Sequence, residues 1–280
     1  MLEREEYVEQ AYLFRMLSER LPENFPLQDL LEQTRYELLA TTKLPMAVDF
    51  LLAELRHSGV MSTAMRRLPH YFSPYQTYVI AAAEDERGRF DMRVAIEILR
   101  HEAAYLAERP TREGLFMYQF ETLCRNRLRY DRGLDAISAD PMYNEDWREW
   151  IQTVRSQIGI VDFADLIYVR SEEYLRRRTR ASESPPTPEK PLLFGEKEGK
   201  IAWANRQKDP MYLFAALQRH LGYPTAPRVK RIDEAREQIP LILRRLERME
   251  TRIKLLEEET RQGLDITKFY AKDDKPPVVP

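Results

Sequence analysis

The clearest helical pattern in the chain is the stretch DMRVAIEILRHEAAYLA, residues 91–107. Its apolar side chains recur three and four positions apart, at Met92, Ala95, Ile96, Leu99, Ala103 and Leu106. Since an α-helix turns once in about 3.6 residues, this spacing places them on one helix face. Asp91 directly precedes them and is a favoured residue for capping the start of a helix. The stretch therefore predicts an amphipathic helix that buries one face in a helical core.

Similar spacing recurs on both sides of this stretch. It predicts further helices over 3–20, 27–41, 45–59, 74–86, 111–129, 141–158 and 210–221. Ser73-Pro74 and Asp209-Pro210 are typical helix starts, because Ser or Asp caps the first turn and the first turn tolerates proline. Only 9 of the 280 residues are glycine, which argues against a turn-rich all-β protein. The chain is therefore predicted to be mainly α.

The pattern changes after Gly159. The runs 192–194 (LLF) and 201–203 (IAW) are short and β-prone, and the polar segment 195–200 between them contains two glycines. This arrangement is typical of a β-hairpin. Because a lone hairpin is marginally stable in water, the β-prone run at 166–170 is expected to join it as a third strand, or a helix is expected to cover it.

These patterns divide the chain into four parts. They predict a helical body at 1–160, a small α+β element at 161–227, a heptad-patterned helix at 228–264 and a disordered tail at 265–280. The α+β element is interrupted at about 181–191 by a segment rich in proline and serine, which is expected to form a flexible loop.

Residues 232–256 carry a heptad repeat, in which apolar side chains fill positions a and d of every seven residues. With Ile232 at position a, the seam consists of Ile232, Ala235, Ile239, Ile242, Leu246, Met249, Ile253 and Leu256. Pro240 interrupts the repeat, so the regular coil begins there or a kinked helix begins near Asp233. The repeat predicts a coiled-coil-like helix through which the chain self-associates.

Charges beside the seam favour a parallel dimer. Arg245 and Arg252 occupy position g, and Glu250 and Glu257 occupy position e. In a parallel pair, g of one chain meets the following e of the other, which joins Arg245 to Glu250 and Arg252 to Glu257. An antiparallel pair would bring like charges together. The repeat does not exclude a trimer. Two other interpretations also remain: the seam packs on the chain's own helical body, or it binds a helix of a partner protein.

The charge balance excludes a general attraction to nucleic acid or anionic membranes, since 44 Lys and Arg face 46 Asp and Glu, for a net charge of -2. A local basic cluster remains at Arg176, Arg177, Arg178 and Arg180. Such a cluster contacts phosphates or an acidic partner, and it supports an alternative function as a nucleic-acid-associated factor.

The location is expected to be cytoplasmic. Cys124 is the only cysteine, so the chain cannot form an internal disulfide, and a reducing compartment suits it. The first residues are acidic and lack the apolar segment of a signal peptide. No run of about 18 apolar residues is present, so no membrane contact is expected.

Signatures of chemistry are weak. Residues 195–200 (GEKEGK) lack the spacing of a phosphate-binding loop, and the chain has neither a cysteine set nor an HExxH motif for zinc. We therefore assign no catalytic residue, no cofactor and no metal site. An open alternative is a helical enzyme with a pocket of His and Glu side chains, built around His57 or His101. The leading hypothesis is a non-catalytic adaptor that assembles through the heptad helix.

Overall fold

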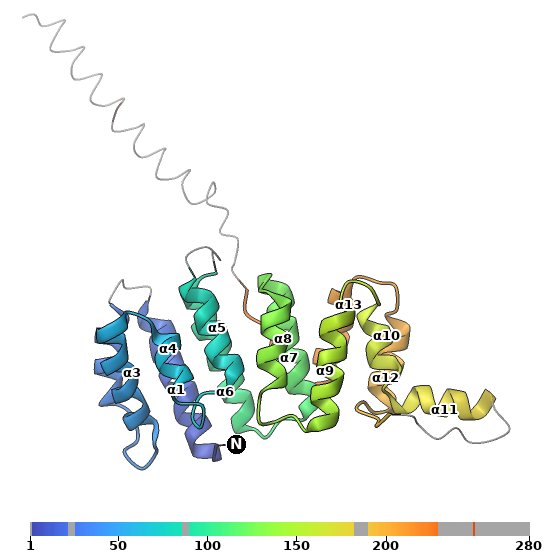
Figure 1. Cartoon of the computed structure of the whole chain (residues 1–280), viewed down its shortest axis with the longest axis horizontal. Helices are drawn as coiled ribbons and strands as arrows, with labels where there is room; N and C mark the ends of the chain where they lie inside the picture. Colours follow the sequence, from blue (N-terminus) through green and yellow to red (C-terminus); the bar gives the residue numbers. More distant parts are fainter. Residues whose placement is uncertain (1, 22–25, 86–89, 182–189, 229–248, 250–280) are drawn as a thin grey trace, which may run out of the picture. The chain divides into compact units, whose positions relative to one another are not determined.

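The structure is a computed structural model that describes residues 2–21, 26–85, 90–181, 190–228 and 249 (Figure 1). The chain divides into two compact units, Met1–Val229 and Lys230–Pro280, and the described residues other than Met249 belong to the first. Thirteen α-helices and no β-strand occur among these residues, so the prediction of a mainly α fold is confirmed.

The helices of the first unit are α1 (Arg4–Arg20), α2 (Leu27–Arg35), α3 (Leu44–Ser58), α4 (Met61–Arg66), α5 (Pro74–Glu84), α6 (Met92–Ala107), α7 (Arg112–Asn126), α8 (Tyr130–Ser138), α9 (Glu145–Gln157), α10 (Phe163–Tyr168), α11 (Glu172–Ala181), α12 (Glu196–Ala204) and α13 (Pro210–Leu221). Most neighbours in sequence pack against each other, and α1 packs most extensively against α6 (Figure 1). None of the described helices is long and apolar enough to cross a membrane.

The amphipathic stretch at 91–107 forms α6 as predicted. Asp91 caps it by accepting a hydrogen bond from the Arg93 backbone N–H at 2.8 Å. The predicted stripe faces the core, where Ala95, Ile96, Leu99, Ala103 and Leu106 are buried. Glu102 lies on the same face and is also fully buried.

Local capping explains where other helices begin. Ser73 and Gln76 form a capping box at the start of α5, and Asp209 caps α13, as the sequence predicts. The helix expected at 141–158 begins later, at Glu145, because Asn144 caps it by accepting from the Trp147 backbone N–H. Asp140 instead accepts from the Met142 backbone N–H at 3.0 Å.

The predicted β-hairpin is wrong. Residues 195–200, expected to form its turn, belong to the start of α12, and most of the expected third strand at 166–170 lies in α10. Among the described residues, the one β-bridge that involves residues 166–203 joins Ser171 and Phe194, and a second bridge joins Ile158 and Val161. The small α+β element at 161–227 therefore has no sheet in its described part.

Gly199, which the sequence places in a turn, lies in a helix instead, and close packing between two helices explains why a glycine is present there. Gly199 is buried inside α12, and a Cβ atom at this position would overlap the side chains of Ser171 and Glu173 at the start of α11. Glycine therefore allows α12 to approach α11. Glu196 and Glu198 lie in the first turn of α12, where acidic side chains stabilise a helix through its dipole.

Several predictions lie outside the described residues. The predicted loop at 181–191 is described only at its ends, where Lys190 pairs with Glu149 at 2.8 Å. The heptad helix at 228–264 and the tail at 265–280 also fall outside, apart from Arg228 and Met249.

Candidate functional site

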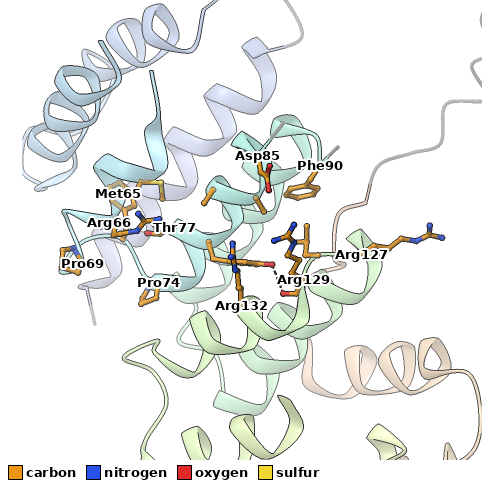
Figure 2. A pocket seen from close by; sticks show the side chains of 15 residues that line it. Met65, Arg66, Pro69, Pro74, Thr77, Asp85, Phe90, Arg127, Arg129 and Arg132 are labelled. Atoms are coloured by element: carbon orange, nitrogen blue, oxygen red, sulfur yellow. Dashed lines mark hydrogen bonds between the residues drawn. The ribbon is translucent and has the colours of Figure 1, made fainter. Parts of the chain in front are cut away.

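A cavity of about 560 Å³ lies where α4, α5 and the start of α8 meet, and we call it the arginine pocket (Figure 2). Its volume falls in the range of about 300–1,000 Å³ that is typical of ligand sites. Its apolar floor is formed by Met65, Phe72, Tyr78, Ala81, Ala82, Phe90 and Leu128.

Four arginines surround this floor: Arg66, Arg127, Arg129 and Arg132. All four are exposed, and none has a side-chain hydrogen bond or ion pair with another described residue. Asp85 is the one acidic residue among the described lining residues, so their four guanidinium groups and one carboxylate carry a net charge of +3. The pocket therefore combines positive charge with apolar surface.

The aromatic segment before and within α5 is split between the core and this pocket. Tyr71, Phe72 and Tyr75 are buried, which agrees with core packing. Tyr78 is half-buried, lines the pocket, and donates a hydrogen bond from its hydroxyl to the Arg129 carbonyl at 2.9 Å. Burial raises the pKa of Tyr78 to about 12, so its phenol stays neutral and fixes α5 against the start of α8.

The end of α7 brings the arginines to the pocket. Arg127 is the C-terminal cap of this helix, and its backbone adopts the left-handed conformation, with φ 54°, which ends the helix. The Leu128 backbone N–H then bonds the Leu123 carbonyl at 3.0 Å, and the Leu128 side chain is buried. As a result, Arg127 and Arg129 flank a buried anchor.

The described lining has the chemistry to recognise an anion attached to an apolar group. Guanidinium groups are charged at every ordinary pH and donate hydrogen bonds in a planar fork to carboxylates, sulfonates and phosphates. The apolar floor would cover the remainder of such a ligand.

Sequence reasoning missed these residues, although a signal for three of them was present. Between residues 125 and 132 the chain carries four arginines and one aspartate, at Arg125, Arg127, Arg129, Asp131 and Arg132. The same charge of +3 is carried by residues 170–180, which contain the cluster of Arg176, Arg177, Arg178 and Arg180 together with Arg170 and two glutamates. Arg66 had no such signal, because it joins the pocket only through the packing of α4 and α8 on α5.

The arginine cluster that the sequence singled out lies on α11, and half of it is engaged. Arg176 pairs with Glu196, and Arg177 pairs with Glu173 at 2.6 Å. Arg178 and Arg180 are exposed and have no side-chain partner among the described residues. Within the described part of the chain, two of the four guanidinium groups on this helix therefore remain without an internal partner.

The Trp203 ring beside α11 already stacks against two arginines of the same chain. The guanidinium of Arg177 lies 4.5 Å from the centroid of the Trp203 ring, and that of Arg206 lies 4.4 Å from it. These contacts use the ring surface on which a nucleic-acid base would stack.

The His and Glu side chains of the alternative enzyme hypothesis do not come together in one pocket among the described residues. His57 is exposed, and Glu54 pairs with Arg67 instead. His101 lies beside Glu97 and Arg100, and no group of three or more His, Cys, Asp or Glu side chains suited to a metal occurs in the described part of the chain. Burial raises the pKa of Cys124 to about 12, so it is held as a thiol rather than a nucleophilic thiolate.

The heptad seam and its flanking charges are not placed by the structure. Of the seam residues, Met249 alone is described, and its side chain is exposed. Ile232, Ile239, Ile242, Leu246, Ile253 and Leu256 lie outside the described residues, as do Arg245, Glu250, Arg252 and Glu257.

The chain was compared with protein-family models, with characterised proteins and with solved structures. No family model, no characterised protein and no solved structure matches it.

Proposed function

We propose that this chain is a non-catalytic adaptor that binds, in the arginine pocket, a partner group that is both anionic and apolar. One observation carries the proposal: four exposed guanidinium groups without described partners surround an apolar floor. Arginines that have no ion pair with another described residue are available to an outside anion without breaking such a pair. Buried apolar area would supply affinity, and the arginines would supply selectivity for charge.

Binding suits this pocket better than proton-transfer chemistry does. A general acid or base needs a pKa near the working pH, whereas arginine keeps its proton and the pKa of Tyr78 is raised to about 12. Neither histidine nor cysteine occurs among the described residues that line the pocket.

The anionic dye 8-anilinonaphthalene-1-sulfonate is a suitable probe, because it joins a sulfonate to aromatic rings. We expect it to bind the full chain, and we expect the double variant R129A/R132A to weaken binding by about tenfold, which corresponds to about 1.4 kcal/mol. Higher salt should weaken binding to the native chain, since exposed charges are screened. Dye fluorescence in a titration measures both effects.

A matched control removes the same charge elsewhere. R178A/R180A deletes two exposed arginines of α11, far from the pocket lining in sequence, and should leave dye affinity within about twofold. The neutral analogue N-phenyl-1-naphthylamine should bind native protein and R129A/R132A alike. Equal affinity of the sulfonate for both double variants would refute the proposal.

A second candidate function, favoured by the heptad repeat of residues 232–256, is self-association. Its apolar seam and its complementary e and g charges support a parallel dimer. This function is independent of the arginine pocket, and a single adaptor can possess both.

Sedimentation velocity tests the second candidate. We expect the full chain at tens of micromolar to sediment as a dimer or higher oligomer, and a chain ending at Val229, the last residue of the first compact unit, to sediment as a monomer. R245E/R252E should weaken the association by setting like charges against Glu250 and Glu257. A full chain that stays monomeric at this concentration would rule self-association out.

A further inference from the structure

The arginine pocket is elongated along one helix. Pro74, Thr77, Tyr78, Ala81 and Asp85 line it and recur three or four residues apart, which places them on one face of α5 and its C-terminal cap. Because α5 has 11 residues, the lined face extends over about 16 Å, or three helical turns. A ligand that fills the pocket would therefore lie along α5.

The centre of this face is formed by small side chains. Thr77, Ala81 and Ala82 line the pocket, with the larger Met65 and Phe72 beside them. Small side chains allow a second helix to approach to about 8–10 Å between axes, and larger side chains of that helix would fill the space between. No sheet edge is offered by the described residues, so a partner cannot be added there as a β-strand.

The arginines lie on both sides of this face. Figure 2 shows Arg66 on one side of the row from Pro74 to Asp85, and Arg129 and Arg132 on the other. Arg66 belongs to α4, whereas Arg132 belongs to α8, and both helices pack against α5. A ligand that pairs with the arginines on both sides needs negative charges on both of its flanks.

We propose that the occupant of the arginine pocket is an amphipathic α-helix of a partner protein, with a stripe of apolar residues flanked by Asp or Glu on both sides. This proposal rests on the proposed function and names the partner of the same site. Apolar side chains at positions i, i+3 or i+4 and i+7 would enter between α4 and α8, and flanking carboxylates would pair with Arg66, Arg129 and Arg132.

A displayed library of helical peptides with random apolar, acidic, basic and neutral positions is the probe. Selection on the native full chain should enrich sequences with an apolar stripe and at least two acidic residues on its flanks. Enriched peptides, made synthetically, should lose at least tenfold in affinity for R66E and for R129E/R132E, because each substitution places like charges together. The substituted residues are exposed, so folding is expected to survive, and circular dichroism checks it.

The control variant R178E/R180E should bind the same peptides within about twofold of native. The proposal is overturned if the enriched peptides lack acidic flanks, or if they bind R129E/R132E as tightly as native protein. It is also overturned if decyl phosphate binds but no selected peptide competes with it. If the native chain still binds the naphthalene sulfonate after one of these outcomes, the pocket takes small anionic ligands. The broader function would then stand without the helix.

Discussion

Replacing Glu102 with glutamine is expected to stabilise the protein at neutral and alkaline pH. The gain in the free energy of unfolding should be about 1 kcal/mol at pH 5, about 3 kcal/mol at pH 7 and about 5 kcal/mol at pH 9. Few single substitutions stabilise a protein this strongly, since most lower the free energy of unfolding.

The cause is the burial of an acid without a cation. Glu102 is fully buried on α6, and its Oε1 accepts a hydrogen bond from Gln119 Nε2 at 2.7 Å. Its other oxygen, Oε2, has no hydrogen-bond partner among the described residues. Burial, with a smaller contribution from the nearby buried Asp140, raises the pKa of Glu102 to about 8.

The sign of the pH dependence follows from these values. Since the pKa of Glu102 rises from 4.5 in the unfolded chain to about 8 in the folded one, the folded state holds a proton that the unfolded state releases. The stability linked to this group is fully present below pH 4.5 and is lost as the pH rises through about 8. Each pH unit in this window costs about 1.4 kcal/mol. Glutamine is neutral throughout and escapes the loss.

Urea denaturation followed by far-ultraviolet circular dichroism at pH 5, 7 and 9 measures the effect. The same buried neighbourhood includes Asp140, whose pKa burial also raises, so the difference between native protein and E102Q reports Glu102 together with its repulsion from Asp140. A difference that stays constant with pH would contradict this account.

Glu121 provides the matched control, because it is a second fully buried glutamate with the opposite surroundings. Its carboxylate pairs with Arg125 and accepts a hydrogen bond from the Tyr223 hydroxyl at 2.8 Å. E121Q should therefore destabilise the protein at pH 7, since it leaves a half-buried guanidinium without its charge partner. Stabilisation by both substitutions would show that ion pairing does not separate the two sites.

The burial of Glu102 has a sequence signal. Glu102 follows Leu99 by three residues and precedes Leu106 by four, so helical spacing places it on the apolar stripe of the 91–107 helix. A charged residue on such a stripe is either buried or marks a gap in the packing. The stripe itself and its cap at Asp91 were predictable because they depend on residues that are neighbours along one helix.

The predicted hairpin is wrong because tertiary contacts, which the sequence does not show, determine the structure of residues 192–203. The run 192–194 does make backbone bonds, since the Leu193 and Phe194 N–H groups both donate to the Arg170 carbonyl. These bonds join it to the segment between α10 and α11, however, and not to residues 201–203. Gly199 resembles a turn residue in sequence, but it serves the close approach of α12 to α11.

The arginine pocket was hidden for a related reason. Two of its walls are α4 and α8, which have 6 and 9 residues, too short for a clear apolar period. Arg66 and Arg132 are distant in sequence and meet only because both helices pack on α5. A sequence shows which residues share a helix face, whereas it does not show which two helices enclose a third.

Trp150→Ala is expected to cost about 3–5 kcal/mol of the free energy of unfolding, because Trp150 joins three parts of the core. Its ring centroid lies 4.9 Å from that of Phe116 on α7 and 5.0 Å from that of Phe194, and Trp150 is 1% exposed. Its indole N–H also donates to the Leu166 carbonyl of α10 at 3.3 Å. Alanine would leave a cavity at this junction and orphan that carbonyl.

The matched control is Trp203→Ala, which removes the same side chain from the surface of α12. Trp203 is 40% exposed, and its ring contacts the guanidinium groups of Arg177 and Arg206 and the ring of Tyr168, 4.7 Å away between centroids. Its loss should cost less than that of Trp150, about 1–2 kcal/mol. Urea denaturation followed by circular dichroism avoids relying on the fluorescence that both variants alter. If W150A and W203A lose equal stability, the buried contacts of Trp150 do not stabilise the core more than the partly exposed contacts of Trp203 do.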